Sequence, residues 1–152
     1  MPDAWILRQW PADGRRGALR TNAVSAVVEV SAALIRDAQG RYLIAQRRPG
    51  SHLAGRWEFP GGKVEVGETP AACMRRELME ELSAAFTVGE LVETVQWEYP
   101  ERTVVLYFFA CQLESGDIVP REQQAIRWVE PAQLADYDFP PADRELIERL
   151  AR

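Results

Sequence analysis

Three glutamates on one predicted helix, Glu77, Glu80 and Glu81, are the residues whose type and spacing most directly indicate chemistry. Spacings of three and four positions place their carboxylates on one helix face, where like charges cost roughly 0.2–0.5 kcal/mol per pair. Arg76 can reach Glu80, but one guanidinium does not balance three carboxylates. A divalent cation does, because hard cations such as Mg²⁺ prefer oxygen ligands and often share their shell with substrate phosphates. For the helix taken alone, a solvated acidic surface is the alternative.

The helix that carries these acids has clear start and burial signals. Thr69 is a good N-cap, and Pro70 stands at the first helical position, where proline is tolerated. At about 100° per residue, four apolar side chains fall on one buried stripe: Ala71, Met74, Leu78 and Leu82. Ahead of the helix, Gly61 and Gly62 give the backbone unusual freedom and predict a bend in short extended structure.

The segment GKVEVGETPAACMRRELMEE, residues 62–81, reads Gly, five residues, Glu, seven residues, then Arg-Glu-Leu-x-Glu-Glu. This pattern resembles the signature of the Nudix hydrolases. The resemblance continues in LIAQRRPGSHLAGRWEFPGGK before it and FPPAD after it, and covers the chain from about Val28 to the C-terminus. In that span the chain is similar to the MutT-like branch, which cleaves nucleoside triphosphates to monophosphates and pyrophosphate.

One position departs from the signature, which normally has Gly where this chain has Ser83. Glycine at a helix C-terminus usually supplies a left-handed turn, a conformation that costs Ser roughly 1 kcal/mol. We therefore expect the helix to run on through residues 83–85 or to end without that turn.

The elements that must position the acids are strands and helices in mixed order. Strands are predicted at residues 24–35, 41–48, 86–99, 102–113 and 124–129, a short helical turn at 131–137 and a terminal helix at 142–152. Interspersed hairpins and helices favour a mixed sheet with helices packed on it. The resemblance implies an α/β Nudix fold, a mixed β-sheet sandwiched between helices, over residues 23–152, with residues 1–22 as an N-terminal extension.

The resemblance also implies a metal-dependent mechanism. Mg²⁺ or Mn²⁺ ions would be held by Glu77, Glu80, Glu81 and the backbone carbonyl of Gly61. They would stabilise charge on the phosphates and lower the pKa of a bound water. Glu77 is implied as the general base. Because family members differ over which carboxylate serves, Glu80 is a second catalytic candidate.

Two further residues belong to this predicted catalytic centre. Arg76 would orient the carboxylates without touching substrate. Glu122 precedes a late strand, where relatives carry another acid, so it is a candidate metal ligand or base. A surface loop acid is the alternative for Glu122.

Several side chains are candidates for binding a nucleotide. Arg47 and Arg48 end the second strand beside the site, where relatives use an arginine for phosphate, and Lys63 is a further candidate. Phe59 either stacks on a nucleobase, as its equivalent does in MutT-like enzymes, or packs in the core.

Asp143 bears on the choice of base. Guanine-oxidation sanitisers of this branch carry Asn in FPPAD, whereas cytidine triphosphate hydrolases carry Asp. An ionised Asp only accepts hydrogen bonds and so suits the cytosine N4 amino group. Oxidised guanine also offers donors, and Asp143 can alternatively N-cap the last helix. The expected substrates are therefore cytidine nucleotides (CTP, dCTP or 5-methyl-dCTP) or 8-oxo-dGTP.

Composition excludes several other partners. The formal net charge of −5 argues against a grip on nucleic acid polymers. No apolar run approaches the ~20 residues of a membrane span, and the first residues lack a signal-peptide pattern.

Cys73 and Cys111 have no metal-type spacing and predict reduced, buried thiols in a cytoplasmic protein. Trp5 and Trp10 predict that the extension docks on the domain or on a second copy, as in a homodimer.

Two other functions are consistent with the same fold. One is hydrolysis of another nucleoside diphosphate derivative, against which FPPAD and the lack of a basic groove argue. The other is a non-catalytic nucleotide-sensing module. Such modules typically lose the acids of the signature, and every one is present here.

Overall fold

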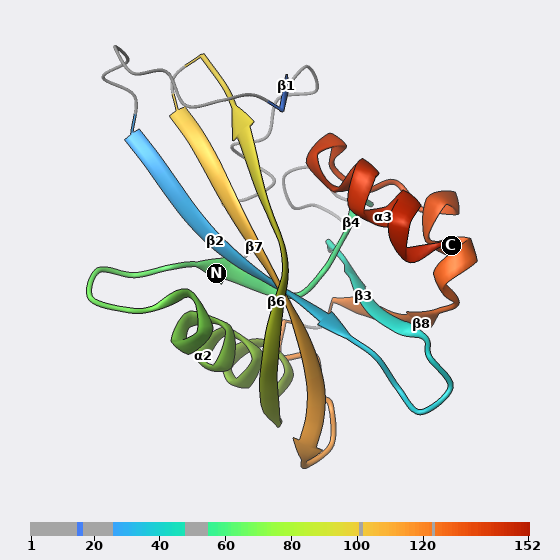
Figure 1. The fold of residues 1–152 in the computed structure, drawn as a ribbon. Helices are drawn as coiled ribbons and strands as arrows, with labels where there is room; N and C mark the ends of the chain where they lie inside the picture. Colours follow the sequence, from blue (N-terminus) through green and yellow to red (C-terminus); the bar gives the residue numbers. More distant parts are fainter. Residues whose placement is uncertain (1–14, 17–25, 48–54, 101, 123) are drawn as a thin grey trace.

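The computed structural model describes residues 15–16, 26–47, 55–100, 102–122 and 124–152. Its strands form two sheets (Figure 1). One has the order β1-β6-β7-β2-β5, and the other has the order β4-β3-β8. The strands are β1 (Arg15–Arg16), β2 (Ala26–Ile35), β3 (Tyr42–Gln46), β4 (Trp57–Glu58), β5 (Gly61–Lys63), β6 (Ala85–Glu98), β7 (Arg102–Ser115) and β8 (Ala125–Val129). The helices are α2 (Pro70–Leu82), η1 (Pro131–Asp136), η2 (Pro141–Asp143) and α3 (Arg144–Leu150).

The larger sheet is mixed, as predicted. Strand β2 pairs in parallel with residues 102–111 of β7 over its whole length, whereas β5 pairs with β2 and β6 pairs with β7 in antiparallel fashion. Helix α2 lies on one side of the long strands, and α3 lies on the other side (Figure 1). The arrangement confirms a mixed sheet between helices.

Strand β2 contributes to two separate hydrophobic clusters, because its successive side chains point to opposite faces. Val30 and Ala32 belong to the cluster that also holds Leu146 of α3, whereas Ala33 and Ile35 join the cluster around α2. The predicted stripe of α2 is confirmed, since Met74, Leu78 and Leu82 are fully buried and Ala71 packs at the cluster's edge. Each helix is therefore fixed to the sheet by its own core.

The glycine pair is not a bend, which corrects the prediction. Gly61 and Gly62 lie in β5, pair with Ala32 and Ser31 of β2, and do not have positive φ angles. Glycine is required at both positions because other atoms of the protein lie too close to leave room for a side chain. A Cβ at Gly61 would lie 2.0 Å from the Ser31 carbonyl oxygen, and one at Gly62 would lie 2.3 Å from the carboxyl carbon of Glu77.

Part of the segment predicted as an extension joins the sheet. Strand β1 pairs with Trp97 and Glu98 of β6, whereas Trp5 and Trp10 lie outside the described residues. Both cysteines are buried and free, as predicted. In the described part of the chain, no helix is long and apolar enough to span a membrane.

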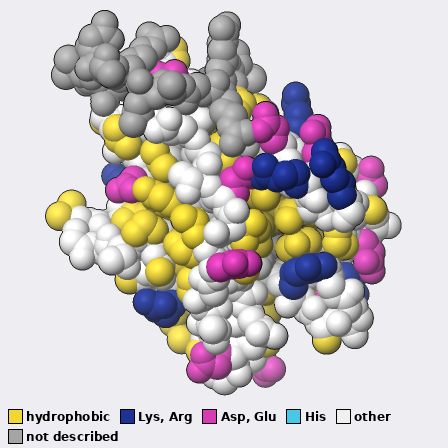
Figure 2. All heavy atoms as spheres, in the orientation of Figure 1, with side chains coloured by type: hydrophobic (Ala, Val, Ile, Leu, Met, Phe, Trp, Pro, Cys, Tyr) yellow, Lys and Arg dark blue, Asp and Glu magenta, His cyan; other side chains and the backbone are white. Residues whose placement is uncertain are grey.

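The surface shown in Figure 2 carries hydrophobic, basic and acidic side chains. Hydrophobic side chains collect along its centre, over the long strands. Basic and acidic side chains stand interspersed in the region of α3. The face that the figure presents therefore carries both signs of charge.

Candidate active site

Helix α2 begins as predicted and ends differently. The Thr69 hydroxyl accepts from the Ala72 backbone N–H at 3.1 Å, and Pro70 is the first helical residue. At the other end Ser83 adopts the left-handed conformation, with φ 58°, and its N–H donates to Met79 O at 3.0 Å. The expectation that the helix would continue or end without this turn is wrong, because serine adopts the glycine conformation.

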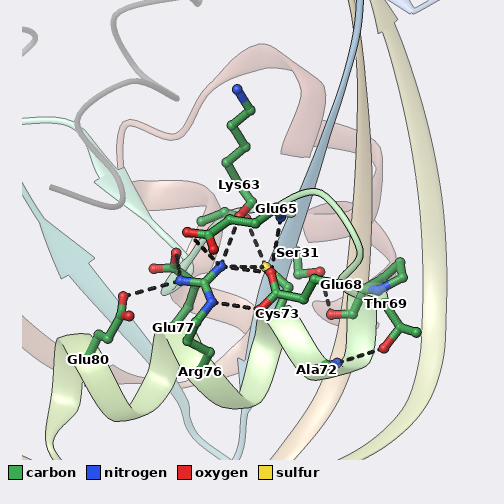
Figure 3. Close-up of polar contacts among 12 residues, drawn as sticks. Ser31, Lys63, Glu65, Glu68, Thr69, Ala72, Cys73, Arg76, Glu77 and Glu80 are labelled. Atoms are coloured by element: carbon green, nitrogen blue, oxygen red, sulfur yellow. Dashed lines mark hydrogen bonds and ion pairs between the residues drawn. The ribbon is translucent and has the colours of Figure 1, made fainter.

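Arg76 is the centre of an ion-pair network on the side of α2 that faces β5 (Figure 3). Its Nε donates to Glu68 Oε2 at 2.7 Å, and its Nη1 donates to Glu77 Oε1 at 2.9 Å and Glu80 Oε2 at 3.3 Å. Its Nη2 also reaches the Lys63 carbonyl at 3.2 Å. Arg76 lowers the pKa of Glu68 to about 2, chiefly through these hydrogen bonds. The network links α2 to β5 by hydrogen bonds and fixes the orientation of the Glu77 side chain.

Glu77 and Glu81 are the two buried acids of the helix, with exposures of 3% and 2%. Burial raises the pKa of Glu77 to about 7, against the opposing effect of Arg76. Burial also raises the pKa of Glu81 well above its usual value, the charge of Glu122 adds to this, and a hydrogen bond from the Gly61 backbone opposes it. Glu80 differs from both, because its side chain is 52% exposed.

One oxygen of each buried acid lacks a protein partner. Glu77 Oε2 and Glu81 Oε2 are buried without a hydrogen bond to any of the described residues. Buried carboxylate oxygens without partners are costly unless a ligand satisfies them, and hard divalent cations take such oxygens. The residues therefore fit a divalent ion. Among the described residues no three acid, His or Cys side chains already surround one point, so binding requires side-chain rotation.

A second pair of buried acids consists of Glu58 in β4 and Asp143 in η2. Glu58 and Asp143 are 9% and 6% exposed. Burial raises the pKa of Asp143 to about 7. Burial raises the pKa of Glu58 to about 8, with the charge of Arg47 opposing and the charges of Asp143 and Glu122 adding. Glu122 thus lies close enough to both Glu58 and Glu81 for its charge to raise the pKa of each.

These two acids line a small cavity with Phe59. Its other walls are Val30, Ala32, Leu106, Phe108 and Pro140, and its volume is about 20 Å³. Phe59 is 4% exposed and packs on Phe108 and Phe139, with ring centroids 6.2 and 5.0 Å apart. Phe59 therefore packs in the core, as one of its two predicted roles requires, and it also lines the cavity, whereas stacking on a nucleobase stays a prediction. A nucleobase would have to part these walls.

The remaining predicted residues are less centrally placed. Strand β3 ends at Gln46, so Arg47 lies just beyond the strand that was expected to contain it. Arg48 lies outside the described residues. Lys63 is exposed, and its amino end extends away from the carboxylates (Figure 3). Asp143 stands at the N-cap position of α3 but makes no side-chain capping bond, which removes the capping alternative.

Sequence reasoning missed Glu58. The local signal was weak, because strand alternation places Glu58 on the face opposite to its neighbours Trp57 and Phe59, and its burial comes from the distant segment around Pro140 and Asp143. Acids are almost never fully buried without a partner or a function. Such a residue marks a candidate site even where no motif includes it.

Comparison with known proteins places this geometry in context. A family model described as NUDIX domain matches residues 31–149. The chain is 40% identical over 124 residues to an 8-oxo-dGTP diphosphatase of Haemophilus influenzae, covering 82% of this chain and 91% of that protein. It is 40% identical over 122 residues to a CTP pyrophosphohydrolase of Escherichia coli, covering 80% and 90%. The solution structure of the E. coli ORF135 protein superposes with a TM-score of 0.71 at 38% identity, covering 87% and 91%.

Proposed function

Because the chain belongs to the NUDIX domain family and is a hydrolase of acid anhydrides, we propose that it converts nucleoside triphosphates to monophosphates and pyrophosphate with Mg²⁺ or Mn²⁺. The observation that supports this proposal is the pair of buried oxygens Glu77 Oε2 and Glu81 Oε2, which have no hydrogen-bond partner in the part of the chain that the structure describes. They lie on a helix that Arg76 ties to the glycine strand. In a helix with only a structural role, two buried carboxylate oxygens without partners would lower the stability of the fold and bring no benefit.

The ions would be held by four carboxylates and one backbone carbonyl: those of Glu77, Glu80, Glu81 and Glu122, and that of Gly61. When bound, the ions neutralise phosphate charge and acidify a water molecule. Glycine at position 62 leaves the Glu77 carboxyl its space beside β5. The metal centre thus consists of one strand, one helix and one loop acid.

Glu77 is suited to take the proton in this reaction. Arg76 occupies Oε1, so when Glu77 acts as the base its Oε2 would accept the proton as water adds to phosphorus, and Glu80, Glu81 and Glu122 would then hold the ions. The α–β anhydride bond breaks as the new P–O bond forms, and pyrophosphate leaves with the bonding electron pair. Burial raises the pKa of Glu77 to about 7 in the absence of a cation, and a cation bound nearby would lower it, so the carboxylate would be ionised and able to accept a proton near neutral pH. Arg76 holds the carboxylate in place and remains charged throughout.

The proposed base-binding site is the cavity between Glu58, Phe59 and Asp143. The sequence argument treated Asp143 as ionised, but burial raises its pKa to about 7. A protonated carboxyl both donates and accepts, as Asn does. The site is therefore compatible with cytosine and with oxidised guanine, and both relatives named above have activities of this kind.

The test is hydrolysis with Mg²⁺ of dCTP, 5-methyl-dCTP, 8-oxo-dGTP, dGTP and ADP-ribose, measured for every substrate by chromatography of the nucleoside monophosphate released. We expect turnover of a cytidine nucleotide or 8-oxo-dGTP and little of ADP-ribose. Glu77→Gln should lose about 10²–10⁴-fold in kcat, whereas Glu90→Gln, an exposed acid on β6, should keep wild-type activity. Absence of turnover on the whole panel would refute the proposal.

The base-binding site is tested on the same panel with Asp143→Asn. We expect a change in the ratio of kcat/KM values for dCTP and 8-oxo-dGTP, because the two substrates present different edges. Since Asp143 does not cap α3 through its side chain, the variant should remain folded. An unchanged ratio would remove Asp143 from base selection.

A further inference from the structure

The loop before β8 binds the C-terminal end of α2. The Val119 N–H donates to Leu82 O and the Arg121 N–H donates to Glu81 O, both at 2.9 Å. Both acceptors are among the last four carbonyls of the helix, which have no partner within it. The loop therefore completes the helix end, and one of its two bonds falls on Glu81, a candidate metal ligand.

Ser83 strengthens this junction at the cost of backbone strain. Among the described residues it is the only non-glycine with positive φ. Glycine adopts this conformation without strain but carries no side chain. The Ser83 hydroxyl accepts a hydrogen bond from Arg121 Nε. Serine thus gives the loop an anchoring atom that glycine would lack.

The residue after Arg121 is Glu122. It therefore follows directly on the backbone bond from Arg121 to Glu81 O, which keeps it near the end of α2, and its charge contributes to the raised pKa values of Glu81 and Glu58. Its own N–H donates to the Gln124 side chain at 3.0 Å. The position of Glu122 therefore depends on where Arg121 is held, one residue away.

We propose that Ser83 is a positioning residue, which through Arg121 holds the Glu122 loop against the end of α2 and so keeps Glu122 close to the helix acids with which it would share a cation. This inference rests on the metal-dependent function proposed above. It explains how the chain tolerates a strained serine: the hydroxyl orders a segment that glycine would leave held only by backbone bonds.

The test compares Ser83→Gly, Ser83→Ala and Arg121→Gln with wild type, using Mn²⁺ binding measured by electron paramagnetic resonance without substrate. Ser83→Gly should melt at or above the wild-type temperature because it relieves strain, yet bind Mn²⁺ about tenfold more weakly. Arg121→Gln should weaken Mn²⁺ binding to a similar extent. The double variant that combines Ser83→Gly with Arg121→Gln should bind Mn²⁺ no more weakly than either single variant, because both remove the same contact. Arg75→Gln, which removes an exposed arginine from α2, should bind as wild type.

A second readout needs no metal. In the apoprotein, amide hydrogen exchange at Arg121 should be faster in Ser83→Gly than in wild type, while exchange in the centre of β7 is unchanged. If Ser83→Gly binds Mn²⁺ and exchanges as wild type, the positioning role is refuted and the metal site stands. If wild type itself binds no Mn²⁺, both proposals fail.

Discussion

Glu58 and Asp143 show how burial alone sets the protonation of two acids in one cavity. Each pKa is raised mainly by burial, and an acid whose pKa is higher in the folded state binds its proton more tightly there. Its contribution to stability is therefore fully present below the pKa of the unfolded chain and is lost as pH rises through the folded pKa. The two acids should therefore destabilise the fold progressively as pH rises from about 4 to about 8, and not in acidic solution.

Asp143→Asn should make this effect visible. Between about pH 4 and pH 7, wild type should lose stability relative to the variant, at up to about 1.4 kcal/mol per pH unit. The amide stays neutral and avoids this loss. Urea unfolding at several pH values measures the difference, with Asp138→Asn as the control because that side chain is 74% exposed. A difference that stays constant across the range would show that Asp143 is ionised freely in the fold.

At the scale of elements, a two-residue strand is held by its neighbours. The Trp57 N–H donates to Asp138 O at 3.0 Å, and Arg127 of β8 lies over the rings of Trp57 and Tyr137 at 5.4 and 5.8 Å. Arg127 Nη1 also donates to the Tyr137 hydroxyl at 3.1 Å. These contacts join β4 to the segment before η2, and so keep Glu58 opposite Asp143.

The two glycines of β5 should respond differently to alanine. Gly61→Ala places a methyl group against the backbone of β2, which cannot move without breaking the sheet, and should cost about 3 kcal/mol. Gly62→Ala meets a side chain that can rotate, so it should cost about 1 kcal/mol but displace Glu77 and lower kcat at least about 100-fold. Urea unfolding and steady-state kinetics separate the effects. Equal losses of stability in both variants would contradict the distinction.

Local signals predicted the local structure well. Thr69 and Pro70 marked the start of α2, and strand patterns located the long β6–β7 hairpin. The site residues on α2 followed from the signature, which is a local pattern. Ser83 was predicted wrongly because its partner, Arg121, is distant in sequence. Glu58 was missed for the same kind of reason, since its burial depends on α3 and η2 closing over β4.

At the scale of the whole molecule, the two acid pairs lie on the two sides of the central sheet's edge. Glu77 and Glu81 belong to the helix on one face, whereas Glu58 and Asp143 line the cavity formed with the other core. Glu122 acts on both. A nucleotide bound between them would place its phosphates and base at sites built by separate cores, so base selection and hydrolysis can be changed independently by mutation.

The parallel pairing of β2 with β7 also decides when the protein can fold. Residue 26 pairs with residue 102 and residue 35 with residue 111, so the central contact of the sheet closes a loop that contains α2. Loops of this length form late and make such topologies slow, on the order of milliseconds to seconds. Stopped-flow refolding monitored by tryptophan fluorescence should lie in this range, and microsecond folding would contradict it. During synthesis, β2 can pair with β5 before β7 leaves the ribosome, so a nascent chain that stops before β7 carries the other edge of its future core strand unpaired and open to aggregation.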